Sequence, residues 1–439
     1  MLAEHYRLIF LNFIHVAICC ISLVCVAQIY PDYFISYRPS GLFSAVIVTT
    51  AFAAISLLFA FAGVSFGYFV GFYFYTMIAG YLWLNRFSEF DYNHPLAALS
   101  AAASAVAFLF PALFISSPIR QVYTLSSTAL DRLLAFILLL GLVTIALGAS
   151  YNFRFVSIEN IYAFRGELAF PTILKYLIGI TSNALLPFAF ACFVGRKDLW
   201  RAGAALLLLL LFYPITLTKL ALFTPAWLVA IMLLSKYFDF KIGVTLSLLV
   251  PTSVGIVLFV FFKNDTISYI AAIPYFGLIN FRMIAIPSLA MEYYNYFFST
   301  HPLTYFCQIS LLKPFVPCPY QQQLADVILN FFGIGGQFNA SLFATEGIAS
   351  LGTLFAPLAA FVSGLVIALG NRLSAGLPPH FILVSGAVLP QALLNVPLTT
   401  VLLTHGAGMI FLLWYITPRN SFIRENQSEL RGKTGSAYG

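Results

Sequence analysis

The 439-residue sequence is 61% hydrophobic, 17% aromatic and only 8% charged, a composition that cannot give a chain of this length a water-soluble surface. It excludes a soluble enzyme and indicates a polytopic membrane protein. The net charge of +7 is spread along the chain, without a Lys/Arg cluster interleaved with aromatic residues, so nucleic-acid binding is excluded.

We expect an all-α fold, a single helical bundle of about twelve transmembrane helices over residues 1–417, because each span needs about 20 apolar residues. Residues 418–439 are expected to form a disordered cytoplasmic tail. The first apolar run follows Arg7 like a signal peptide, but its length predicts a retained anchor. The expected spans are 8–29, 42–62, 64–84, 96–116, 133–150, 168–194, 202–217, 219–234, 242–262, 347–369, 379–396 and 399–416.

The long segment 263–346 is the one stretch that does not resemble a simple membrane span, because charged, aromatic, Pro and Gly residues are mixed within it. We expect it to lie outside the membrane and to carry short surface helices. One is predicted over Leu303–Leu312, which is amphipathic, and a second over Gln323–Phe332, where Gly333 ends it.

The positive-inside rule predicts the orientation of the spans. The set of alternate loops that includes both termini carries most of the Lys and Arg residues, among them Arg120, Arg132, Arg196 and Lys197. Both termini are therefore expected to be cytoplasmic. On that topology the insert at 151–167, the hairpin tip at Lys219 and the segment 263–346 all face the outside.

The six cysteines do not predict a metal site. Cys19, Cys20 and Cys25 lie within the first apolar run, where core thiols are expected. Cys307 and Cys318 both fall in the long segment, and their spacing leaves open whether they form a disulfide in an oxidising compartment.

Four basic residues in the external segments are candidates for anion binding. Arg154 and Arg165 lie beside Glu159 and Glu167, so local ion pairing is the alternative to phosphate binding by their planar guanidinium groups. Lys219 separates two apolar runs, and there it either reaches the membrane surface or faces an aqueous cavity.

Arg282 lies in an apolar context in which an unpaired guanidinium is costly. We therefore expect it to have a bound anion or an acidic partner. Tyr293 is either an interfacial anchor or a ring that stacks on a sugar. His301 and Glu346 are candidates for a general base, although each could also serve only to cap or orient a helix.

The order of these features resembles the Wzy-type O-antigen and capsular polysaccharide polymerases over about residues 150–370. The resemblance rests on Ile161-Tyr162-Ala163-Phe164-Arg165-Gly166-Glu167, Thr216-Leu217-Thr218-Lys219, Arg282 with Ala285-Ile286-Pro287, Tyr293-Tyr294, Asn339-Ala340-Ser341, Glu346-Gly347 and Gly352.

This resemblance implies a multi-pass enzyme of the bacterial inner membrane, an inverting glycosyltransferase without metal or other cofactor. It would join undecaprenyl-diphosphate-linked oligosaccharide repeat units at the periplasmic face, with membrane lipid and a chain-length regulator protein as further partners. Arg165, Lys219 and Arg282 match the basic positions expected to hold the donor diphosphate. Arg154, Tyr293 and Asn339 are the other expected substrate-binding residues.

Three alternatives remain open. An O-antigen ligase shares the lipid-linked donor and the side of the membrane. A lipid-linked oligosaccharide flippase would more naturally keep its charges inside the bundle, whereas here they concentrate in the external segments. A glycosyltransferase that uses a lipid monophosphate usually has paired acidic residues in the first external loop, where this chain has only Asp32.

Overall fold

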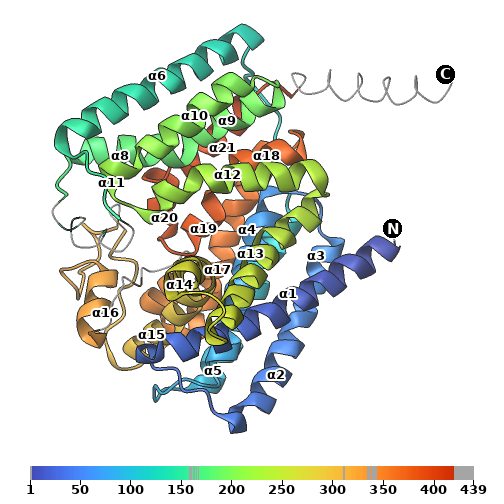
Figure 1. Cartoon of the computed structure of the whole chain (residues 1–439), viewed down its shortest axis with the longest axis vertical. Coiled ribbons are helices and arrows are strands. Elements are labelled where there is room, and N and C mark those ends of the chain that lie inside the picture. The colour runs from blue at the N-terminus through green and yellow to red at the C-terminus, as the bar shows by residue number, and fades with distance from the viewer. Residues whose placement is uncertain are drawn as a thin grey trace. The chain divides into compact units, whose positions relative to one another are not determined.

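The computed structural model describes residues 2–157, 161, 164, 166, 168–309, 312–333, 338 and 344–419, and these residues form an all-helical protein (Figure 1). The only β-type pairing in this part of the chain is an isolated bridge between Ile35 and Ser88. Within the described residues, ten helical stretches are long and apolar enough to cross a membrane. The predicted fold class, a polytopic helical membrane bundle, is confirmed.

The chain divides into two compact units where the sequence predicts a single domain over residues 1–417. Unit 1 comprises Met1–Ser116, Lys241–Leu369 and Pro390–Thr399. Unit 2 comprises Ser117–Phe240, Gly370–Leu389 and Thr400–Gly439. Each unit therefore combines segments that are far apart in the sequence.

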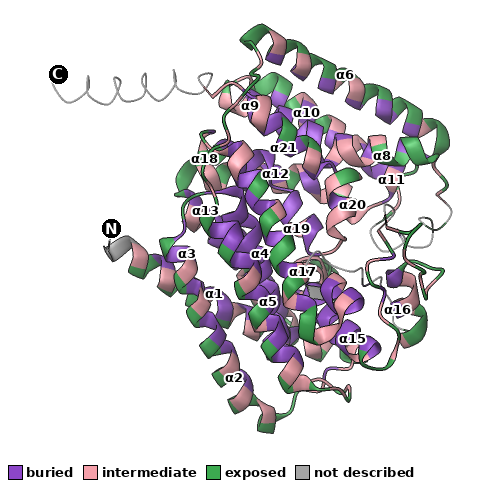
Figure 2. Cartoon of the chain, turned by 180° about the vertical axis from the view of Figure 1, so that it is seen from behind, coloured by how far each residue is buried: buried purple, intermediate pink, exposed green. Residues whose placement is uncertain are grey.

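Unit 1 is built around α4 (Phe66–Leu84), whose 19 residues are all buried (Figure 2). Ser65 caps this helix by accepting a hydrogen bond from the backbone N–H of Tyr68. The other N-terminal helices of the unit are α1 (Leu2–Ile29), η1 (Pro31–Tyr33), α2 (Pro39–Ala53), η2 (Ala54–Ser56), α3 (Leu57–Phe61) and α5 (His94–Phe114).

The second part of unit 1 begins at Lys241 in α13 (Phe240–Lys263) and continues with a 32-residue helical stretch, Tyr269–Thr300. This stretch consists of α14 (Tyr269–Phe276), the π-helical η4 (Gly277–Ala285) and α15 (Ile286–Thr300). It corrects the prediction that segment 263–346 holds only short surface helices. The sequence prediction failed because the charged and polar residues of this helix interrupt its apolar run.

The helix Tyr269–Thr300 first runs back along α13. Near its start the ring of Tyr269 contacts Phe262, and further along the amide of Asn280 donates to the carbonyl oxygen of Thr252. At 1.5 Å per residue, Thr252 lies about 16 Å along α13 from its end at Lys263. The π-helical segment is therefore the deepest part of the stretch.

After η4 the helix returns toward its starting end. Phe281 stacks on Tyr30 at the end of α1, and the Tyr293 hydroxyl donates to the carbonyl oxygen of Tyr33. Burial raises the pKa of Tyr30 to about 12, with further contributions from the nearby phenols of Tyr269 and Tyr33. Residues 30–33 thus lie close to three parts of this helix, which are its start at Tyr269, its bend at Phe281 and its last part at Tyr293. Both ends of the helix therefore lie at one end of unit 1.

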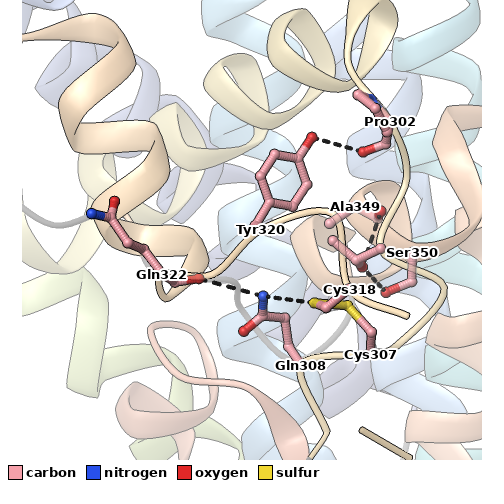
Figure 3. Close-up of a disulfide and its surroundings, with 9 residues drawn as sticks. Pro302, Cys307, Gln308, Cys318, Tyr320, Gln322, Ala349 and Ser350 are labelled. Carbon is pink, nitrogen blue, oxygen red and sulfur yellow. Dashed lines mark hydrogen bonds between the residues drawn. A yellow bond between two sulfur atoms is a disulfide. The ribbon is translucent and has the colours of Figure 1, made fainter. Parts of the chain in front are cut away.

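The segment that follows α15 is held by the disulfide between Cys307 and Cys318, whose Cα atoms are 5.3 Å apart (Figure 3). The Tyr320 hydroxyl donates to the carbonyl oxygen of Pro302 at 2.8 Å and closes the same loop. The predicted helix Leu303–Leu312 is absent from the described residues, because Tyr305 and Phe306 have φ values of 47° and 62°, which no α-helix accommodates.

The second predicted surface helix is confirmed as α16 (Leu324–Phe332). Gly333 ends it with φ 65°, the left-handed conformation that glycine adopts without steric cost. Beyond it, α17 (Ala344–Ser374) changes direction at Gly352, where φ is 77°. A side chain at Gly347 would collide with Ala356, so the short first part of α17 packs against the second.

Unit 2 contains the predicted hairpin around Lys219. The helix before it ends at Thr216, Leu217 adopts a left-handed φ of 47°, and the Thr218 hydroxyl caps the next helix by accepting from the N–H of Ala221. The helices of the unit up to this point are α6 (Ser127–Tyr151), α8 (Thr172–Ile180), η3 (Thr181–Leu185), α9 (Leu186–Gly195), α10 (Leu199–Leu211), α11 (Tyr213–Thr216) and α12 (Lys219–Tyr237).

The last two predicted spans, 379–396 and 399–416, are wrong as continuous helices. They are broken into α18 (Pro379–Ser385), α19 (Leu389–Leu393), α20 (Leu398–Leu403) and α21 (Ala407–Ile416). Gly406, with φ 76°, separates the last two because its left-handed backbone does not continue a helix. The predicted tail is described only for Pro418 and Arg419.

Candidate functional site

A buried polar network lies at the end of unit 1 where the helix Tyr269–Thr300 starts and finishes. Its centre is Glu292 on α15, which is 0% exposed. The Tyr92 hydroxyl donates to one carboxyl oxygen of Glu292, and the other oxygen, Oε1, has no hydrogen-bond partner in the described part of the chain. A buried carboxyl group with one unpaired oxygen is costly, so the network is a candidate functional feature.

The network continues from Tyr92 into α4 and α5. The Asn85 amide lies 3.0 Å from the Tyr92 hydroxyl and 3.0 Å from Nδ1 of His94. Nε2 of His94 lies 2.8 Å from the carbonyl oxygen of Phe90, an obligate acceptor, so Nε2–H donates and Nδ1 accepts. His94 therefore orients the Asn85 amide. We call Glu292, Tyr92, Asn85, His94, Tyr81, Asn295 and Thr353 the Glu292 network.

Two further helices join the network through Asn295. Its amide donates to the Tyr81 hydroxyl at 3.2 Å, and its carbonyl oxygen accepts from the Thr353 hydroxyl at 2.8 Å. Thr353 follows the change of direction at Gly352 in α17. The network thus holds α4, α15 and α17 in one arrangement through buried hydrogen bonds.

Burial raises the pKa of the Tyr92 hydroxyl well above its usual value, and the nearby Glu292 carboxyl adds to this shift. The neutral phenol is therefore the form that fits the site. A neutral phenol is also what a donor to Glu292 requires, so burial and hydrogen bonding favour the same protonation state.

A cavity of about 410 Å³ opens beside this network. Five aromatic rings and two acidic side chains line it, which are Phe34, Phe90, Tyr296, Phe331, Phe332, Glu89 and Asp91. We call it the aromatic cavity. The loop between α4 and α5 is fixed there because the Ser36 hydroxyl donates to the Glu89 carboxylate and the Glu89 N–H donates to the carbonyl oxygen of Phe34.

His301 does not line the aromatic cavity but contacts Phe331, one of the rings that do. Its ring stacks on Phe297 with 4.0 Å between centroids, and it meets Phe331 edge-on at 5.1 Å. Nδ1 lies 2.9 Å from the carbonyl oxygen of Phe297, so Nδ1–H donates there. The lone pair is then left on Nε2, which makes no hydrogen bond within the described part of the chain, and this arrangement suits a proton acceptor.

The second predicted base, Glu346, lies near the start of α17 and is half-buried. Its Oε2 is 3.4 Å from the backbone N–H of Leu398, which donates to it. Glu346 is therefore also accessible to a ligand in part, unlike Glu292.

Tyr293, predicted as an interfacial anchor or a sugar-stacking ring, is neither. It is 0% exposed, and its ring packs between Phe332 and Phe338 at centroid distances of 4.7 and 4.6 Å. Tyr296, three residues further along this helix, is half-buried and lines the aromatic cavity.

The predicted basic residues are distributed over both units. Arg282 belongs to η4 in unit 1, is half-buried, and forms no hydrogen bond or ion pair within the described residues. Arg154 and Lys219 belong to unit 2, where Arg154 is exposed with its guanidinium carbon 6.0 Å from the centroid of the Phe164 ring. Arg165 and Asn339 lie outside the described residues.

Sequence reasoning missed most of the Glu292 network and the aromatic cavity. The signal available was weak, because Asn85, Glu89, Asp91, Tyr92 and His94 form one short polar interval between two apolar runs. In the described part of the chain, three or more His, Cys, Asp or Glu side chains nowhere cluster as a metal site requires.

No protein-family model, no curated protein sequence and no solved structure matches the chain.

Proposed function

We propose that this membrane protein is an oligosaccharide repeat-unit polymerase that joins undecaprenyl-diphosphate-linked glycans at the outer face of a bacterial inner membrane. The observation that carries the proposal is His301, whose Nε2 is free to accept a proton beside a cavity lined by aromatic rings and carboxylates. Aromatic rings and carboxylates are the side chains suited to holding a sugar ring and its hydroxyl groups.

The proposed step is an inverting transfer. A hydroxyl oxygen of the acceptor glycan attacks the anomeric carbon of the donor glycan and forms the new C–O bond. The bond from that carbon to the diphosphate oxygen breaks, and undecaprenyl diphosphate leaves with the electron pair. His301 Nε2 takes the hydroxyl proton, with Glu346 as the second candidate, and Arg282 stabilises the charge that builds on the leaving diphosphate.

The disulfide supports an external location for this site. Cys307 and Cys318 are paired in the same segment that carries His301 and α16. Structural disulfides persist in oxidising compartments such as the periplasm and are rare in the cytosol. The glycan substrates of the proposed reaction would be met on that side of the membrane.

The direct test uses purified protein in detergent with undecaprenyl-diphosphate-linked repeat units and no added nucleotide or divalent metal. A ladder of longer lipid-linked glycans is expected. If the protein only moves these lipids across the bilayer of sealed vesicles, a transporter replaces the proposed enzyme. If glycan is transferred only to lipid A core, a ligase does.

The role of His301 is tested with His301→Phe, which retains a ring able to stack on Phe297 but has no proton acceptor. Activity is expected to fall at least about a hundredfold, the usual range for a lost general base, at unchanged thermal stability. Gln321→Ala, an exposed substitution in the same segment, is the matched control. Full activity of His301→Phe would transfer the role to Glu346, to be tested as Glu346→Gln.

A further inference from the structure

The aromatic cavity has a marked charge bias. Glu89 and Asp91 are both exposed, and none of the residues that line the cavity is basic. Asp91 makes no hydrogen bond or ion pair with any described residue. The cavity therefore presents free carboxylate oxygens, which accept hydrogen bonds strongly from hydroxyl or ammonium groups and repel anions.

The rings of the cavity are held in place but remain partly exposed. Phe90 stacks on Tyr296 with centroids 4.7 Å apart and an interplanar angle of 19°, and it also contacts Phe332 at 5.2 Å. Phe331 is 47% exposed at the rim. Such fixed rings offer apolar faces at a small entropic cost, because few rotamers are lost when a ligand binds.

We propose that the aromatic cavity is a subsite for a neutral or amine-bearing sugar ring of the glycan, and that it discriminates against acidic sugars. The C–H face of a pyranose ring is apolar and packs on an aromatic face, while its hydroxyl groups radiate from the edge and reach the carboxylates. The role of this subsite in polymerisation rests on the proposed function, whereas the affinity of the cavity for sugar rings does not.

The same chemistry separates this subsite from the place of the diphosphate. Two carboxylates without a basic neighbour in the lining disfavour a group that carries two or more negative charges. Arg282, in contrast, belongs to η4, the deepest part of the bent helix. The glycan and the diphosphate would thus be held by different parts of unit 1, one acidic and aromatic, the other basic.

Binding can be measured without any lipid or turnover. The full-length protein in detergent is titrated by calorimetry with four trisaccharides, which are maltotriose, chitotriose, the amine-bearing chitosan trimer and the anionic trigalacturonate. The neutral and amine-bearing probes are expected to bind, with trigalacturonate at least about tenfold weaker, which corresponds to about 1.4 kcal/mol. Equal binding of all four, or of none, would overturn the proposal.

Two groups of variants locate the binding. Tyr296→Ala and Phe331→Ala should each weaken binding of the neutral probes about tenfold, since each removes a stacking face. Tyr305→Ala is the matched control, because Tyr305 is a 61% exposed aromatic residue of the same segment outside the cavity. Unchanged affinity in Tyr296→Ala and Phe331→Ala would place the sugar elsewhere.

If the two carboxylates repel anionic sugars, removing their charge should tighten binding of the anionic probe, a result that misfolding cannot produce. The double substitution Glu89→Gln with Asp91→Asn should improve trigalacturonate binding about tenfold and weaken that of the chitosan trimer. No change in either direction would show that these carboxylates do not set the selectivity. This assay needs no donor lipid, so it separates the two proposals. Sugar binding without polymerisation would contradict the proposed function alone. Polymerisation without selectivity among the trisaccharides would contradict the subsite alone.

Discussion

The Tyr92 hydroxyl donates a hydrogen bond to the buried carboxyl group of Glu292, joining two residues that are 200 positions apart in the chain. This bond connects the loop between α4 and α5 to α15, and both of these elements line the aromatic cavity, together with Phe34 and α16. The arrangement of the cavity therefore depends on a contact in the protein interior.

We expect Tyr92→Phe to destabilise the protein, because it removes the hydroxyl that donates to the buried carboxyl group of Glu292. A buried acceptor left without its partner costs about 1–3 kcal/mol. Thermal unfolding in detergent should show a lower midpoint than in Tyr123→Phe, a control at an exposed tyrosine. Equal midpoints for the two variants would mean that the Glu292 network contributes little to stability.

The stability difference between the wild type and Tyr92→Phe should depend on pH. Since burial raises the pKa of Tyr92 in the folded state, the folded protein holds this proton more tightly than the unfolded chain. The free energy that the Tyr92 hydroxyl contributes to stability is then fully present below the tyrosine pKa of the unfolded chain, about 10, and it falls as pH rises above that value. In chemical denaturation at pH 8, 9, 10 and 10.5, the free energies of unfolding of the two proteins should approach each other as pH rises. A difference that stays constant would show that ionisation of Tyr92 is not linked to folding.

Arg282→Lys should lose most of the proposed polymerase activity while the protein level and thermal stability stay unchanged. A guanidinium offers a planar two-point contact to phosphate oxygens, whereas lysine offers one compact ammonium. Loss of one such contact to a developing charge costs about 3 kcal/mol, or roughly a hundredfold in rate. Activity of Arg282→Ala within a few-fold of the wild type would remove Arg282 from the site.

Cysteine labelling can test whether the helix Tyr269–Thr300 returns to the side on which it starts. Thr266 precedes it, Gln322 follows it, and both are exposed. Single cysteines at these positions, in a background lacking the four free cysteines, should both react with a membrane-impermeant thiol reagent in intact cells. Gly63→Cys, at the opposite end of α4, should react only after lysis. Labelling at only one of positions 266 and 322 would show that the helix crosses the membrane.

The disulfide predicts how many cysteines react with a thiol reagent before and after reduction. Cys19, Cys20, Cys25 and Cys192 are free, and Cys307 is paired with Cys318. Denatured protein treated with a thiol-reactive polyethylene glycol should gain four adducts without reduction and six after reduction, read as mobility shifts on a gel. Six adducts without reduction would indicate that the segment is in a reducing compartment.

Much of the fold could be predicted from the sequence, because a membrane span and a helix end are local signals. The length of apolar runs predicts the spans of α6, α10 and α12, and Gly333 predicts the end of α16. The hairpin before Lys219 could also be predicted, since a short polar interval separates two apolar runs there.

The candidate site could be predicted only in part. Arg282 could be predicted from its apolar surroundings, and His301 and Glu346 as candidate proton acceptors. The pairing of Tyr92 with Glu292, in contrast, has no local signal. The burial of Tyr293 and the place of Tyr296 beside the cavity both depend on the packing of α15 against Phe332 of α16, which no local pattern indicates.

The complete burial of α4 has a consequence for how the protein is made. This helix contains four tyrosines and three glycines, and it is not among the ten stretches apolar enough to cross a membrane by composition. A segment of such modest hydrophobicity partitions poorly into lipid from the translocon. We therefore expect α4 to stay at the insertion machinery until α5 has been synthesised. A nascent chain that stops after α4 should leave this helix exposed to extraction and proteolysis, whereas one that continues past α5 should protect it.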